Sequence, residues 1–309
     1  QHTSDDFYLK NYEISSPLIS SDSLLNSSIG FKGFNEDLVI ETNFQIFEDL
    51  AKSKTDRYEY VYPDYKFEKV LNNAFASHGR FTIGSSGFIK KYDTNTTEKN
   101  IVNDLTFKSN PIFTKTGFVN NYNILLKNYN TDATNSAIYD NRNKNKLASI
   151  AEYNSSFPLK KIEKNYDNIL RPLLSFRFSP SQTENIKDDD RRINFDNIFS
   201  FDRLSANSTV EGGSSLTYGT EFSKVDKSER KVFSAKIANS VRHKEETNLP
   251  QNSGLWKKTS NIVGGLSFNP SDLLEIDYDF SLDENLSDTT YQKLDTAIRI
   301  NKLTTTFGY

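Results

Sequence analysis

The chain has 309 residues, a net charge of -3 and a hydrophobic fraction of 35%, with a mean hydropathy of -0.65. This apolar fraction is low for a soluble protein with a large core, and the acidic balance argues against nucleic acid as a partner. No run of 18 apolar residues occurs, which excludes helical membrane spans, and the absence of cysteine excludes disulfides and zinc–thiolate sites.

Apolar and polar residues alternate with a period of two along most of the chain, starting with residues 37–47. Successive side chains of a strand point to opposite faces, so such a segment needs hydrocarbon on one face and water on the other. A tilted strand that crosses a bilayer needs about 9 to 11 residues, and both 37–47 and 272–283 are long enough. Candidate strands lie near residues 24–32, 37–47, 57–70, 80–91, 101–109, 116–128, 146–156, 168–179, 214–224, 230–242, 259–269, 272–283, 290–301 and 302–309.

The connections between these candidate strands differ greatly in length. Those at 33–36 and 269–271 are tight, whereas 130–145 and 179–213 are long and polar. An even number of strands with short turns at one rim and long loops at the other is typical of outer-membrane barrels. The sequence therefore predicts an all-β, antiparallel transmembrane β-barrel, with no visible domain boundary and no convincing amphipathic helix.

The two faces of the predicted strands carry different chemistry. A Lys or Arg on the lipid face would cost about 2 to 4 kcal/mol at mid-membrane, and the alternating apolar positions contain no charge. The polar positions are then candidates for the lumen lining of a barrel: Glu41, Asn43, Gln45, Glu275, Asp277 and Asp279. The water-exposed face of a soluble antiparallel sheet would show the same alternation, so this alternative stays open.

Nothing in the sequence has the spacing of a catalytic, metal or cofactor site. The histidines His2, His78 and His243 are scattered, and the carboxylates of 188–190 are neutralised by the arginines that follow, which favours a solvated loop. The paired glycines at 212–213 lack the strand-to-helix context of a phosphate-binding loop. We therefore predict no catalytic residue, no metal and no cofactor.

One segment, residues 195–219, resembles a signature of the LptD (OstA) family of outer-membrane lipopolysaccharide-assembly proteins. It reads FDNIFSFDRLS, followed by VEGG and LTYG, and the preceding RPLLSFRFSP at 171–180 fits the same resemblance. Residues 5–12, 44–47 and 60–65 also match, so the resemblance spans nearly the whole chain. The motif positions are Asn197, Phe199, Ser200, Asp202, Arg203, Glu211, Gly212 and Gly213.

This resemblance implies a function. Members assemble lipopolysaccharide in the outer leaflet of the cell outer membrane, through a large barrel from which the lipid exits sideways between the first and last strands. The implied partners are lipopolysaccharide, outer-membrane lipid, the plug lipoprotein LptE and the periplasmic Lpt bridge, which delivers lipid to an N-terminal β-jellyroll. The family's disulfide control has no cysteines to act through here.

We expect residues 1–309 to be an incomplete part of such a barrel, without the jellyroll, forming an open or curved sheet whose terminal strands do not pair. The alternating last strand ends in the aromatic Tyr309, as complete barrels often do, and this argues the other way. Two other functions stay open. A porin-like channel explains the alternation but not residues 195–219, and a secreted soluble β-sheet binding protein explains the polar composition but not the strand lengths.

Overall fold

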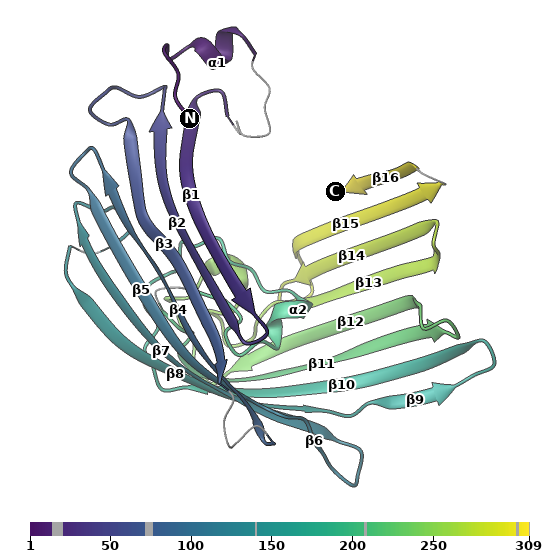
Figure 1. Ribbon diagram of the computed structural model, residues 1–309. Coiled ribbons are helices and arrows are strands. Elements are labelled where there is room, and N and C mark those ends of the chain that lie inside the picture. Colours follow the sequence, from purple (N-terminus) through teal and green to yellow (C-terminus); the bar gives the residue numbers. More distant parts are fainter. Residues whose placement is uncertain (14–20, 72–76, 140, 207–208, 301–302, 309) are drawn as a thin grey trace. The chain divides into compact units, whose positions relative to one another are not determined.

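Antiparallel strands make up most of the computed structural model, which describes residues 1–13, 21–71, 77–139, 141–206, 209–300 and 303–308 (Figure 1). The hydrogen-bonded order is β1-β2-β3-β4-β5-β7-β8-β10-β11-β12-β13-β14-β15-β16, with β6 paired to β7 and β9 to β10. Each predicted strand corresponds to one strand of this order, so the all-β antiparallel prediction is confirmed. Residues 301, 302 and Tyr309 lie outside the described residues.

The strands group into two compact units that are described separately. The first comprises residues 1–107 and 126–147, and the second comprises 108–125 and 148–309. The first unit holds α1 (Tyr8–Asn11), β1 (Leu24–Asn35), β2 (Leu38–Asp49), β3 (Tyr58–Leu71), β4 (Gly79–Tyr92), most of β5 (Thr97–Ser109), the larger part of β7 (Val119–Thr134) and the start of β8 (Lys144–Ser156).

The second unit holds the end of β5, the start of β7, the rest of β8 and all the elements that the first unit does not contain. These elements are β6 (Ile112–Phe113), β9 (Leu159–Ile162), β10 (Tyr166–Ser179), α2 (Phe195–Ile198), β11 (Gly213–Asp226), β12 (Lys231–Arg242), the 3-10 turn η1 (Gln251–Ser253), β13 (Ile262–Ser271), β14 (Leu274–Leu282), β15 (Thr289–Ile300) and β16 (Leu303–Gly308). Within the described ranges, no helix has the length and apolar character that a membrane span requires.

Prolines explain the two short strands that the sequence did not predict. Pro111 separates β5 from β6, and Pro158 separates β8 from β9. Because proline has no backbone N–H, it interrupts the hydrogen-bond ladder, and each strand resumes one residue later. Thus β6 and β9 are continuations of the preceding strands, which extend the β6–β7 and β9–β10 hairpins.

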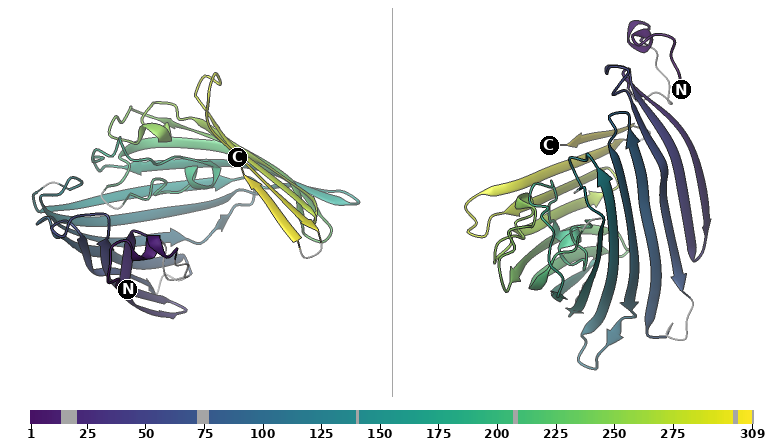
Figure 2. Two further views of the ribbon diagram at one scale, coloured as in Figure 1. Left: turned by 90° about the horizontal axis from the view of Figure 1, so that it is seen from above. Right: turned by 90° about the vertical axis from the view of Figure 1, so that its left-hand side faces the viewer.

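In the first unit, the N-terminal segment docks beside one end of β1–β3 (Figures 1 and 2). Leu9 of α1 is buried with Leu25 and Leu50. Asp6 accepts two hydrogen bonds from the guanidinium of Arg57, at 3.0 and 2.5 Å, and Glu48 accepts a third at 2.8 Å. An apolar contact and a bidentate ion pair therefore hold this segment.

In the second unit, burial is inverted with respect to a soluble protein. We call the side of β10–β14 that carries Leu174 and Tyr218 the apolar face, and the opposite side, with Arg177 and Ser240, the polar face. Leu174 and Tyr218 are 43% and 48% exposed, whereas Arg177 and Ser240 are 2% and 0% exposed. The large hydrophobic side chains thus point to the surroundings, as they do in a sheet that faces lipid.

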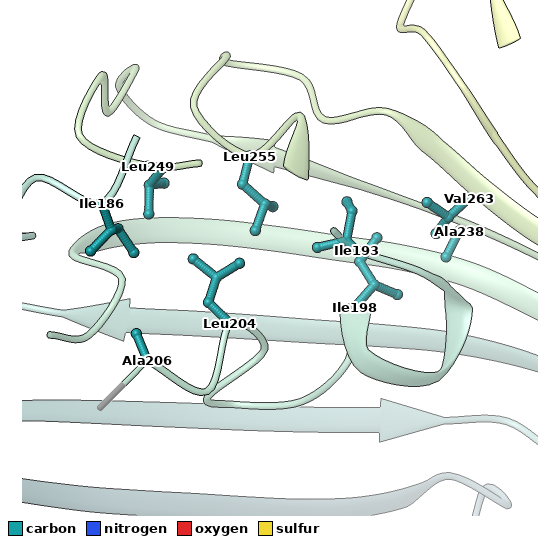
Figure 3. Packing of buried hydrophobic residues seen from close by; sticks show 9 residues of the cluster. All are labelled: Ile186, Ile193, Ile198, Leu204, Ala206, Ala238, Leu249, Leu255 and Val263. Atoms are coloured by element: carbon teal, nitrogen blue, oxygen red, sulfur yellow. The ribbon is translucent and has the colours of Figure 1, made fainter. Parts of the chain in front are cut away.

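The polar face is covered by two connections between strands, of which the structure describes residues 180–206 and 209–212 in the first and 243–261 in the second. They form a core with the sheet, in which Ala238 and Val263 are the strand residues (Figure 3). The other buried members are Ile186, Ile193, Ile198, Leu204, Ala206, Leu249 and Leu255, with Phe195, Phe199 and Trp256 packed against them. We call residues 180–212 the cover segment.

Candidate functional site

The cover segment contacts the sheet first at Ser181, which accepts a hydrogen bond from the Ser149 N–H of β8 at 2.9 Å, and again through the short helix α2. Asn194 caps this helix by accepting hydrogen bonds from the backbone N–H groups of Asp196 and Asn197, both at 3.0 Å. The Asn197 side chain in turn accepts from the Asn194 backbone at 2.8 Å, which completes a capping box. Phe195 and Phe199 lie one helical turn apart with ring centroids at 5.7 Å. The motif residue Asn197 therefore fixes the start of the helix that presents these two rings.

A glycine on the sheet makes room for one of these rings. A Cβ added to Gly219 of β11 would lie 3.0 Å from the Phe199 ring and 2.5 Å from the Ile237 carbonyl oxygen. Since side chains do not approach this closely, only glycine allows Phe199 to sit so close to the strand. The motif residues Phe199 and Gly219 are thus complementary in shape.

The end of the cover segment is fixed by a buried network of charges. Arg203 donates to both carboxylate oxygens of Glu211, at 2.6 and 2.5 Å. It also donates to Ser215 and Ser240 at 3.0 Å each, and to Thr217 at 3.3 Å. Because these hydroxyls belong to β11 and β12, a single guanidinium ties the cover segment to two strands.

Two arginines of the strands complete the network around Glu211. Arg242 of β12 donates to the Glu211 carboxylate, and also to the Gly212 carbonyl oxygen at 2.6 Å. Arg177 of β10 has a terminal nitrogen 4.0 Å from Glu211 and donates through Nε to the Phe201 carbonyl oxygen at 2.8 Å. All four charged side chains are at most 5% exposed, so three buried cations share one buried anion.

The charges around Glu211 determine its ionisation. Burial acts to raise the pKa of the Glu211 carboxyl, but the neighbouring charges of Arg203, Arg177 and Arg242 and the hydrogen bond from Arg203 outweigh it. The net result is a pKa well below the ordinary value of 4.5. The three arginines therefore favour the charged form of Glu211, on which their own pairing depends.

The two motif glycines follow directly and allow close backbone packing. A Cβ at Gly212 would lie 2.2 Å from the Ser181 carbonyl oxygen, and the Gly212 N–H donates to Thr183 at 2.9 Å. Gly213 has a φ of +82°, a conformation that favours glycine. These glycines let the end of the cover segment lie against its own beginning before β11 starts.

A cleft of about 530 Å³ lies on the polar face beside α2. The rings of Phe195 and Phe199 line it together with the charged side chains of Arg171, Glu221 and Lys231. Glu221 forms ion pairs with both cations: its carboxylate oxygens lie 2.5 Å from a terminal nitrogen of Arg171 and 3.4 Å from Nζ of Lys231. The cleft thus offers an aromatic wall and a charged wall to a molecule that has both kinds of surface.

The predicted lumen residues fall into two groups, one in each unit. In β2, Glu41 pairs with Lys32 at 2.6 Å, and Asn43 and Gln45 follow on the same face. In β14, Glu275 pairs with Arg299 at 2.6 Å, and Asp279 lies 3.8 Å from Lys236, whose Nζ is 3.0 Å from Asp196 of α2. Asp277 stands between Glu275 and Asp279 on that face. That these residues line a lumen stays a prediction.

The remaining motif residues support the network less directly. Ser200 donates its backbone N–H to the Asn197 carbonyl oxygen at 2.9 Å, and the Asp202 carbonyl oxygen accepts from Ser205 at 3.1 Å. Sequence reasoning missed Arg177, Arg242, Thr217 and Ser240, which the network joins to the motif. The sequence does hint at their role, because Arg177 and Arg242 occupy polar positions of their strands and each has a serine two residues away, on the same face.

Comparison with known proteins gives one positive finding. The family model described as LPS transport system D, LptD, matches residues 1–309, which is the whole chain. No curated protein matches the sequence.

Proposed function

Because the chain belongs to the LptD family, which acts in lipopolysaccharide transport at the outer membrane, we propose that it forms part of a β-barrel wall along which lipopolysaccharide reaches the outer leaflet. The observation that carries this proposal is the inverted burial of the second unit. An exposed apolar face suits lipid, and a charged and hydroxylated opposite face suits a hydrated passage. The family match over residues 1–309 supports this function over the porin-like and soluble alternatives.

Transport of this kind is a partitioning process without bond chemistry. Acyl chains remain with hydrocarbon while sugars and phosphates follow polar groups, so the wall must present both surfaces. The polar positions of β2 and β14, namely Glu41, Asn43, Gln45, Glu275, Asp277 and Asp279, are the proposed hydrated lining. The cover segment lies on the polar face of the second unit, where the Arg203–Glu211 network holds it against β11 and β12. No catalytic residue, metal or cofactor is part of the proposal.

The partners and the exit route follow from the family and remain proposals. LptE would occupy the lumen, the periplasmic Lpt bridge would deliver lipid through a jellyroll, and the lipid would leave sideways at the seam between the first and last strands of the full barrel. The cleft beside α2 is a place on this route where both an acyl chain and a charged group find contacts, because Phe195 and Lys231 line the same space.

Site-specific photocrosslinking tests which face meets the transported lipid. A photoreactive residue at Asp277 should yield a lipopolysaccharide adduct, because that side chain points to the proposed passage. The matched control is the adjacent Tyr278, on the apolar face of the same strand. Adducts of equal intensity at both positions, or an adduct at Tyr278 alone, would contradict the assignment.

A further inference from the structure

A groove of about 610 Å³ lies on the apolar face of the second unit. Its lining includes Phe118, Phe157, Pro172, Leu174, Tyr218 and Ile237. The ring centroids of Phe118 and Phe157 are 4.7 Å apart. Small side chains at Ser155 and Thr220 keep the groove open between the larger ones. Its volume falls in the range of pockets that bind small molecules, which is about 300–1,000 Å³.

Two lysines lie on the same face, further along the strands that form the groove. Lys161 of β9 and Lys224 of β11 are both register partners of Asn168 of β10, so the three side chains stand in one row. Lys224 is four residues beyond Thr220, which corresponds to about 13 Å along a strand. Leu170 and Phe222 occupy the positions between the groove and this row. The face therefore changes from apolar to cationic over a short distance.

One carboxylate, that of Glu163, lies near both lysines and near the Asn168 side chain. Lys161 pairs with Glu163 at 2.7 Å, but its side chain is 77% exposed, and exposed pairs of this kind contribute little. The ammonium group of Lys224 lies 4.4 Å from the centre of the Tyr166 ring. A tyrosine with a lysine over its ring is typical of the level at which a barrel meets lipid headgroups. The row therefore carries two cations and one carboxylate, which leaves it with a net positive charge.

We propose that this groove binds one anionic glycerophospholipid, with an acyl chain along the groove and its phosphate between Lys161 and Lys224. The positive charge of the row favours an anionic headgroup. The row at Asn168 lies at the end of the strands where a short turn follows Asp226, and short turns are on the periplasmic side of outer-membrane barrels. Binding at this groove is separate from passage along the polar face, so either of the two can fail alone. Phospholipid held here would fix the depth of β9–β12 in the membrane.

Native mass spectrometry of the full-length protein in detergent tests the proposal, with dioleoyl phosphatidylglycerol and dioleoyl phosphatidylcholine as probes. The wild type should retain one phosphatidylglycerol about tenfold more tightly than phosphatidylcholine, because each lysine near an anionic headgroup contributes favourably. Lys161→Gln/Lys224→Gln should abolish this preference. Thr220→Phe should weaken the binding of both lipids at least tenfold, since the phenylalanine ring would fill the groove.

The matched control is Lys160→Gln/Lys227→Gln. Lys160 lies in β9 and Lys227 in the turn directly after β11, and both pair with Asp167 on the polar face, at 2.8 and 2.5 Å. Their removal changes the net charge equally and should leave the preference for phosphatidylglycerol intact. Equal retention of the two lipids by the wild type, or an equal loss in this control, would overturn the proposal.

Discussion

At the scale of single residues, the most informative feature is that one buried carboxylate is the counter-charge of three buried arginines. Desolvation of each charge is costly, and contacts among the members offset this cost for all but the terminal nitrogens of Arg177, which make no hydrogen bond to the described residues. Glu211 does this for Arg203 and Arg242 directly, and the hydroxyls of Ser215, Thr217 and Ser240 take the remaining guanidinium hydrogens of Arg203. The cluster joins the cover segment to β10, β11 and β12, and Glu211 is its centre.

Replacing Glu211 with Gln should destabilise the second unit by about 3–5 kcal/mol, because it leaves buried arginines without a counter-charge. Trp256, the single tryptophan of the chain, lies in the connection 243–261, packs against the core and provides the probe. We expect urea titration followed by its fluorescence to show the loss. Asp272→Asn, which removes an exposed partner of Arg230, is the control and should change the free energy of unfolding by less than about 1 kcal/mol. Equal effects of the two variants would contradict the role of Glu211.

The same carboxylate predicts how stability depends on pH. The folded pKa of Glu211 lies below its ordinary value of 4.5, so the unfolded chain takes up the proton more readily. Its contribution is therefore complete above pH 4.5 and declines as the pH falls through that value toward the folded pKa. We expect the urea midpoint reported by Trp256 to drop below pH 4.5 in the wild type and to drop less in Glu211→Gln. Parallel pH profiles of the two proteins would argue against this linkage.

At the scale of elements, each strand of the second unit has two faces that meet different surroundings. β14 pairs Ile276 with Phe268 on the apolar face and Asp277 with Ser267 on the other. This alternation follows from the pleat of the strand, and the cover segment then determines how much of the polar face meets water. In this way a connection between strands, and not the sheet alone, sets the surface of the proposed passage.

A pair of substitutions on β14 tests the assignment of the faces. Ile276→Arg should impair folding into membranes by about 2–4 kcal/mol if Ile276 faces lipid near mid-membrane. Asp277→Asn, the adjacent position on the polar face, should be tolerated. Folding into lipid vesicles, followed by the mobility shift of folded barrels on gels, measures both variants. The same loss at both positions would show that the faces are wrongly assigned.

At the scale of the whole molecule, β1 and β16 stand at the two ends of the strand order. A strand with an unpaired edge exposes backbone groups that lipid cannot satisfy. We therefore expect isolated residues 1–309 to aggregate, and the terminal strands not to pair with each other. Size-exclusion chromatography of the refolded chain should show large species, and a monodisperse monomer would contradict the first expectation.

Because the chain contains no cysteine, introduced pairs can test closure directly. Ile29→Cys combined with a cysteine at Leu303, Thr305 or Phe307 covers three registers between β1 and β16, and none should form a disulfide in membranes. Ile29→Cys with Phe44→Cys is the positive control, because these residues are direct partners in β1 and β2. A disulfide between β1 and β16 in any of these registers would contradict this expectation.

The sequence by itself determined the strands and their two faces, because the pleat turns alternation along the chain into opposite surfaces. It also pointed to residues 195–219. The positions of β6 and β9 could have been derived, since Pro111 and Pro158 only interrupt a ladder that then resumes. Tertiary structure alone decided that the long polar connection at 180–212 folds onto the sheet. Its arginine and glutamate look like those of a solvated loop until Arg177 and Arg242, distant in sequence, are brought around Glu211, and only that convergence compensates the cost of burying them.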